Sequence, residues 1–279
     1  MSPSDPDHID PQLISSLLLA FRQTGGDTSQ FLVIGGGAAV SWYMAVSGDH
    51  GAEVMTTRDV DFQIPPHTPP TVITAFAKAV NGIVHWPGID NHTPEIAIVE
   101  IPDYFGPDES LEIDFLPGVH GLSPKETDKH ADYVALYGPS GEKIGYRVIH
   151  PVHVACNIVE NYVKLNRRST TNLDRLRSIL PVIQQYIAES AKRAYETGEA
   201  ALAEDARWSI RTLLKQSNSV DYAQFTHDTG IDLLDAIPHR EDAPIDGLFW
   251  DREYGRLAKA VKKRREKLRT RLGNIEKLK

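Results

Sequence analysis

The fold is decided by the stretch FLVIGGGAAVSWYMAV, residues 31–46. Its first four residues are apolar and predict a short buried strand, and the three glycines that follow predict a sharp turn. Residues 38–46 then have the composition of a helix. Glycines let a ligand approach the backbone closely, and the N–H groups that open the next helix favour anions. This strand–glycine–helix unit predicts an α/β arrangement with an anion-binding corner.

The pattern on either side extends this arrangement. Asp10-Pro11 begins a helix that Gly25-Gly26 ends, and a second helix is predicted over 71–80. Further strands are predicted over 58–64, 95–101, 110–116, 133–136 and 143–149. After His150-Pro151 the chain is helix-forming, with helices expected near 152–165, 171–189, 192–216 and 248–279. We therefore expect two domains, an α/β half over 1–150 and an all-α half over 151–279.

Composition excludes several classes of protein. The chain has 279 residues, of which 41% are hydrophobic and 24% charged, as in ordinary globular proteins. The single cysteine, Cys156, excludes an intramolecular disulfide and a Cys-rich zinc site, and it favours a reducing compartment. No apolar run approaches the ~18 residues of a membrane span, and the first ten residues lack the Lys or Arg of a signal peptide. We expect a cytoplasmic protein that does not enter membranes.

The net charge of −8 conceals a strong asymmetry. Residues 256–279 contain 11 Lys and Arg against 2 Glu, whereas the rest of the chain is strongly acidic. A solvated helix explains this segment without any function, and an RNA-binding helix explains it equally well. An apolar stripe along the same segment would let it dock on the protein: Leu257, Val261, Leu268 and Leu272.

Carboxylates occupy two of the predicted strands. Side chains alternate between the faces of a strand, so Asp59 and Asp61 share one face, as do Glu112 and Asp114. If the two strands are neighbours, these groups converge and repel one another. Oxygen-ligated Mg²⁺ relieves such repulsion and is completed by phosphate oxygens. A phosphate-binding glycine corner beside a carboxylate cluster predicts a nucleoside triphosphate bound with metal ions.

Each of these features alone has a simpler explanation. Three glycines form tight turns, Asp-x-Asp occurs at solvated strand ends, and alternating carboxylates occur on the wet face of edge strands. The ordered combination, with every carboxylate on the matching face, favours the functional interpretation.

This combination resembles the DNA polymerase β-type nucleotidyltransferase superfamily. The resemblance is carried by Ile34-Gly35-Gly36-Gly37, by Asp59-Val60-Asp61-Phe62 and by Ile113-Asp114-Phe115. The sequence VIGGGAAVSWY…TTRDVDFQI is also similar to the AbiEii-like branch of this superfamily, which includes toxins of toxin–antitoxin systems. It implies a mixed sheet flanked by helices, two Mg²⁺ ions, and transfer of a nucleoside monophosphate with release of pyrophosphate.

The resemblance also assigns roles to residues. It implies that Asp59 and Asp61 hold both metals and that Asp114 completes the second metal site and helps to deprotonate the acceptor hydroxyl. Glu112 remains the alternative third carboxylate. The triphosphate would lie against Gly35, Gly36 and Gly37, with further contacts from Ser41 and Lys164. Lys164, Arg168 and Asp174 match only loosely the Lys, Arg and Asp that the branch carries after its sheet.

Two departures from the family pattern stand out. Gly37 replaces a common Ser, and 21 residues separate it from Asp59, more than is usual. We therefore consider two functions: a nucleotidyltransferase acting on an RNA 3′ end, a protein or a small molecule, as a toxin with an antitoxin partner; or a non-catalytic module that binds a nucleotide or a protein. A metal phosphohydrolase is a third, weaker reading.

Overall fold

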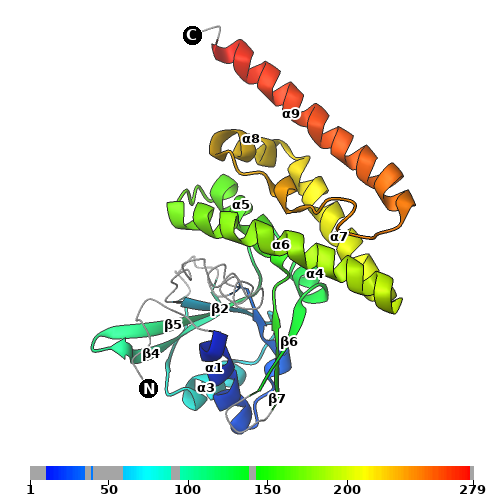
Figure 1. Cartoon of the computed structure of the whole chain (residues 1–279). Helices are drawn as coiled ribbons and strands as arrows, with labels where there is room; N and C mark the ends of the chain where they lie inside the picture. Colours follow the sequence, from blue (N-terminus) through cyan, green and yellow to red (C-terminus); the bar gives the residue numbers. More distant parts are fainter. Residues whose placement is uncertain (1–10, 35–38, 40–58, 89–94, 138–142, 277–279) are drawn as a thin grey trace. The chain divides into compact units, whose positions relative to one another are not determined.

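The computed structural model describes residues 11–34, 39, 59–88, 95–137 and 143–276. The chain divides into two compact units, residues 1–154 and 155–279, which are described separately (Figure 1). We expected a boundary near residue 150; the observed division falls after Val154, inside the helix α5, Pro151–Lys164.

Within the described residues, the first unit is built on a mixed sheet of seven strands in the order β3-β4-β5-β2-β1-β7-β6. β2 pairs with β5, and β1 with β7, in parallel, whereas the other neighbours are antiparallel. The strands are β1 (Leu32–Val33), β2 (Asp59–Gln63), β3 (Ile83–His85), β4 (Ala97–Gly106), β5 (Glu109–Leu116), β6 (Asp132–Tyr137) and β7 (Lys143–Val148). The sequence predicted every strand except β3.

Two helices, α1 (Pro11–Gln23) and α3 (Pro70–Ala79), cover one face of this sheet (Figure 1). Between them and the strands lies an aromatic core in which Phe31 contacts four other rings at centroid distances of 5.4 to 5.7 Å. The other rings are Phe21 of α1, Phe62 of β2, Phe76 of α3 and Phe115 of β5, all of them buried. This core fixes which face of β2 and β5 points inward.

A short helix, α4 (Pro124–Lys129), reaches the other face of the sheet at the end of β2. Gln63 links the two, because its amide donates to the carbonyl of Pro124 at 3.1 Å and accepts from the Thr127 hydroxyl at 2.8 Å. Six residues are too few to show a helical period, which explains why the sequence did not predict α4.

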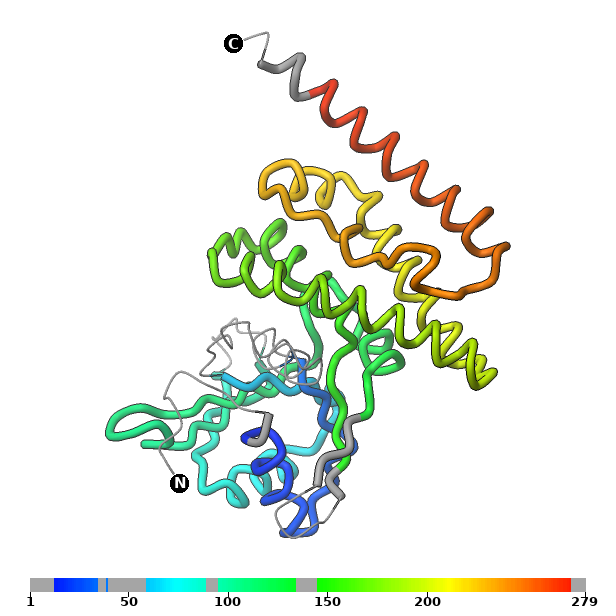
Figure 2. Tube along the Cα trace, in the orientation of Figure 1, coloured from blue at the N-terminus to red at the C-terminus, as the bar shows by residue number. Residues whose placement is uncertain are grey.

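The second unit is helical and contains, after α5, the long helices α6 (Thr170–Thr197) and α7 (Ala200–Ser217), then α8 (Val220–Thr229) and α9 (Gly255–Glu276). A turn of 3₁₀-helix spans Leu233–Ala236, and a π-helical turn, Phe249–Tyr254, leads into α9 (Figure 2). The Ser169 hydroxyl accepts from the Asn172 N–H at the start of α6, and Gly198, at φ 74°, ends it. The expected end at residue 189 was therefore too early; the break is the glycine.

The helix α9 docks on the rest of the helical unit at Val261 and, among the described residues, through an ion pair of Arg265. Val261 is buried, and the Arg265 guanidinium binds both carboxylate oxygens of Asp232 at 2.5 and 2.6 Å. The Nε of Arg264 donates to the carbonyl of Asn218 at 3.1 Å. The docking stripe predicted from the sequence is thus present at Val261.

Cys156 lies in α5 and is fully buried. The Tyr222 hydroxyl of α8 donates to its carbonyl at 3.0 Å. Burial raises the pKa of the Cys156 thiol to about 12, so the thiol stays protonated in the folded unit.

Within the part of the chain that the structure describes, no helix is long and apolar enough to cross a membrane.

Truncating the central ring of the aromatic core should destabilise the first unit. We expect Phe31→Ala to lower the free energy of unfolding by about 3–5 kcal/mol, because it leaves a cavity among four rings. Phe31→Leu keeps part of the buried volume and should cost less than Phe31→Ala. Urea unfolding followed by circular dichroism measures both. The control is Ile83→Ala, an exposed side chain whose loss should change little; equal effects for Phe31→Ala and Ile83→Ala would contradict the proposed core.

Candidate active site

The parallel pairing of β2 and β5 brings the predicted carboxylates together. In register, Asp59 lies opposite Glu112, and Asp61 lies opposite Asp114. Side chains of residues paired in this way point to the same face of the sheet. The intervening residues face the core and are buried, whereas Asp61 and Asp114 are partly exposed and Asp59 and Glu112 are exposed. The structure therefore places Asp59, Asp61 and Asp114 on one accessible face, as the sequence predicted.

This face, which we call the acidic face, continues across β4 to the edge strand β3. Glu100 of β4 pairs with Glu112, and Ile98 pairs with Asp114. β3 then pairs in register with β4. Two rows of side chains result, one containing Ile83, Glu100, Glu112 and Asp59, the other containing His85, Ile98, Asp114 and Asp61.

The carboxylates of the acidic face differ in their hydrogen-bond partners. Glu100 accepts a hydrogen bond from the Ser110 hydroxyl at 2.7 Å and contacts Nε2 of His85 at 2.9 Å. These two contacts lower the pKa of Glu100. In contrast, Oδ1 of Asp114 is shielded from water and has no hydrogen-bond partner among the residues that the structure describes. A buried oxygen without a donor is costly, and a cation or a proton would compensate it.

The electrostatics of Asp114 support the same conclusion. Desolvation, followed by the charges of Glu95, Asp59 and Glu112, raises the pKa of Asp114 to about 6. The carboxyl group is therefore partly protonated near neutral pH, and a bound cation would restore its charge.

The fit of the acidic face to a metal ion rests on the chemistry of its donors. Among the residues that the structure describes, no group of three or more His, Cys, Asp or Glu side chains is already arranged to hold a metal. The donors available are carboxylate oxygens, the ligands that Mg²⁺ prefers, and one of them lacks a partner. This donor set suits a hard divalent cation.

The predicted glycine corner lies outside the described residues, as does Ser41: Gly35, Gly36 and Gly37 have no described structure. Ile34, the residue before them, is held against β2, because its N–H donates to the carbonyl of Asp61 at 2.9 Å. The chain thus enters the glycine segment next to the carboxylates.

Lys164 belongs to the second unit and already has an acidic partner. Its ammonium group pairs with Asp221 of α8, which raises the pKa of Lys164. Asp174 pairs with Arg177 at 2.6 Å, and the Arg168 guanidinium lies 5.3 Å from the centre of the Tyr162 ring. A phosphate bound by Lys164 would compete with Asp221. The role of Lys164 in holding a triphosphate stays a prediction.

His150 and His153 are packing residues at the start of α5. Both are buried, and Nδ1 of His150 accepts from the N–H of Val152 at 3.2 Å, which caps the helix. Burial, followed by the neighbouring His150 and His130, lowers the pKa of His153 to about 3. The interpretation of this pair as a helix entry rather than a metal site fits these contacts.

Three residues near the acidic face were not singled out in the sequence. Glu95 precedes β4 and acts on Asp114 through its charge. Glu100 and His85 form a pair on the acidic face. The alternation of Glu100 with buried Val99 and Ile101 was a usable signal, whereas β3 is too short for its period to be read.

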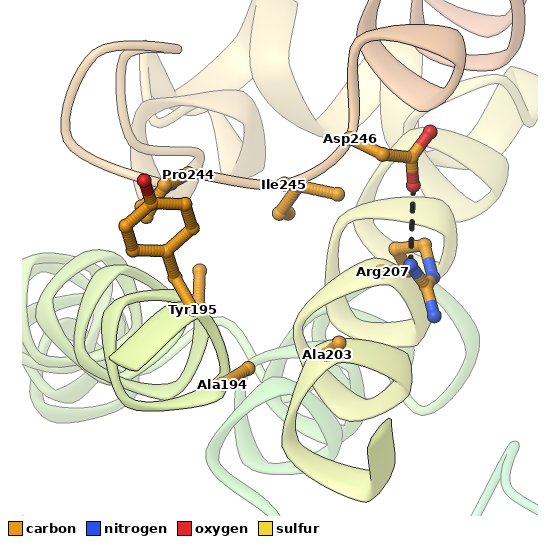
Figure 3. A pocket seen from close by; sticks show the side chains of 8 residues that line it. Ala194, Tyr195, Ala203, Arg207, Pro244, Ile245 and Asp246 are labelled. Carbon is orange, nitrogen blue, oxygen red and sulfur yellow. Dashed lines mark hydrogen bonds and ion pairs between the residues drawn. The ribbon is translucent and has the colours of Figure 1, made fainter. Parts of the chain in front are cut away.

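A separate cavity of about 410 Å³ lies in the helical unit between α6, α7 and residues 244–246 (Figure 3). Ala194 and Ala203 lie at its floor, and the exposed ring of Tyr195 flanks it. Its charged lining residues, Arg207 and Asp246, pair with each other at 3.2 Å. Because this pair is satisfied, the cavity offers less for catalysis than the acidic face does.

Comparison with known proteins does not identify a family for this chain. No protein-family model matches the chain, and no curated protein sequence matches it.

The raised pKa of Asp114 predicts a specific dependence of stability on pH. The folded state binds this proton more tightly than the unfolded state, whose Asp pKa is about 3.9, so metal-free protein should lose stability as the pH rises from about 4 to about 6. Asp114→Asn should remove this loss and stabilise the protein at pH 7.5 by on the order of 1 kcal/mol, a value reduced for partial exposure. Urea unfolding in chelator-containing buffers across this pH range measures it.

The matched control is Glu112→Gln, which removes only the smallest contribution to the shift and should keep most of the pH dependence. An unchanged slope in Asp114→Asn would show that another group titrates.

Proposed function

We propose that the protein is a Mg²⁺-dependent nucleotidyltransferase that moves a nucleoside monophosphate from a nucleoside triphosphate to a hydroxyl group. The observation that carries the proposal is the register of β2 and β5, which gathers Asp59, Asp61 and Asp114 on one accessible face. The partnerless Oδ1 of Asp114 and the mixed sheet support it. The resemblance of the glycine and Asp-x-Asp motifs supplies the reaction type.

In this proposal the carboxylates have separate tasks. Asp59 and Asp61 would hold the metal ions, and Asp114 would complete the second site. The ions supply charge neutralisation at the triphosphate and at the attacking oxygen. The acceptor oxygen forms a bond to the α-phosphorus while the bond to the pyrophosphate oxygen breaks. The proton of the hydroxyl would pass to an oxygen of Asp114, acting as the general base.

The acidic face also constrains how the triphosphate is held. Carboxylates repel phosphates, so the nucleotide must approach with its charge compensated by the metals and by backbone N–H groups. Ile34, whose N–H donates to the carbonyl of Asp61, directly precedes the glycines, and in this proposal their N–H groups would supply part of that compensation. Catalysis would then depend on positioning and electrostatics rather than on a covalent intermediate.

The direct test is incubation of the whole chain with Mg²⁺, each of the four labelled nucleoside triphosphates, and total cellular RNA and protein. Label in RNA or protein together with pyrophosphate release supports the proposal and identifies the acceptor class. Release of inorganic phosphate would indicate a phosphohydrolase instead. Nucleotide binding by calorimetry without either product would indicate a non-catalytic nucleotide-binding module.

Neutralising either carboxylate of the Asp-x-Asp pair should abolish transfer. We expect Asp59→Asn and Asp61→Asn each to reduce the rate by at least about 10³-fold, because each removes a carboxylate that would hold the metal ions whose positive charge stabilises the transition state. Circular dichroism should show an unchanged fold, since both side chains are on the accessible face. Glu100→Gln is the matched control on the same face, because Ser110 and His85 already satisfy Glu100. Near-native turnover in both Asp variants would refute the assignment.

A further inference from the structure

The helix α9 carries a row of cations along one side. Lys259, Lys263, Lys267 and Arg271 follow one another at intervals of four residues, so they lie on one face of the helix, about 6 Å apart along its axis. All four are exposed, whereas Val261, which faces the neighbouring helices, is buried. We call these four residues the basic ridge.

The basic ridge is not used to attach the helix. Docking depends on Val261, on the pairing of Arg265 with Asp232 and on the contact of Arg264 with Asn218. In the described part of the chain, no ion pair or hydrogen bond engages the side chains of the ridge. Glu266 is the only acidic residue between positions 254 and 276, so the sequence offers few partners along the helix.

Without a bound anion, the cations of the basic ridge destabilise the helix α9. Like charges four residues apart repel each other and destabilise a helix, and here three such pairs follow in succession. A bound polyanion would turn this repulsion into attraction and release counterions.

The chemistry of the ridge distinguishes between possible partners. Protein interfaces are built on buried apolar and aromatic anchors surrounded by polar groups. The ridge has no aromatic residue, and its apolar neighbours on α9 face the protein. Evenly spaced point charges without groups to read bases are instead typical of contacts to a phosphate backbone.

We propose that the basic ridge of α9 binds the phosphate backbone of RNA, without preference for sequence. This proposal concerns a surface of the helical unit and does not require the acidic face to be catalytic. If the acceptor of the proposed transfer is RNA, the ridge would give the enzyme affinity for it.

The test compares two double variants with equal loss of charge. Lys263→Gln/Lys267→Gln removes the centre of the ridge, and Lys262→Gln/Arg269→Gln removes two exposed cations elsewhere on the helix. Fluorescence anisotropy with a labelled 20-nucleotide RNA, between 50 and 300 mM KCl and without nucleotide, gives the affinity and its salt dependence. The ridge variant should weaken binding about tenfold at low salt and reduce the slope of log K against log salt by about 1 to 2.

The control variant should change affinity less than threefold. Equal effects of the two variants, or no salt-dependent binding by the wild type, would overturn the proposal. Stronger binding of poly-glutamate than of RNA would also overturn it and would indicate an acidic protein partner. Asp61→Asn should bind RNA like the wild type, so failure of the ridge and failure of the catalytic proposal give different results.

Discussion

The parallel register between β2 and β5 is the constraint on which the candidate site depends. The ring of Phe62 stacks on that of Phe115 at 5.8 Å, and both belong to the aromatic core beneath α1 and α3. Because side chains alternate, a slip of one residue in either strand would expose a ring and bury a carboxylate. The hydrophobic core therefore aligns Asp61 with Asp114, although neither of them contributes to that core.

Two parts of the chain concentrate charge of one sign on one face. The acidic face gathers carboxylates beside Asp114, and the basic ridge aligns cations on α9. Other charges are paired, as in Arg265 with Asp232 or Arg211 with Glu253. A site at which the sequence keeps a destabilising arrangement of charges is a candidate for function, because such an arrangement does not serve the stability of the fold. Their signs are opposite, as expected for a metal-dependent site and a phosphate-binding surface.

Periodicity predicted most of the fold and the shared face of the carboxylates. Alternation around Val60 and Ile113 was enough to give their orientation, and the predicted end at Gly25 is a real helix end, whereas the end at Gly198 was not predicted. Elements too short to display a period, β3 and α4, could not be predicted. Neither could the pairing partner of a strand, since it depends on contacts distant in sequence. The lone oxygen of Asp114 and the influence of Glu95 arise only when these strands meet.

The single thiol of this chain has a practical consequence. Cys156 is enclosed between α5 and α8, with the Tyr222 hydroxyl bound to its backbone, and burial keeps its pKa near 12. A modifying reagent can reach it only when these helices separate. The rate of alkylation would therefore report opening of the helical unit alone, without an introduced label, while the sheet unit, which lacks cysteine, stays silent.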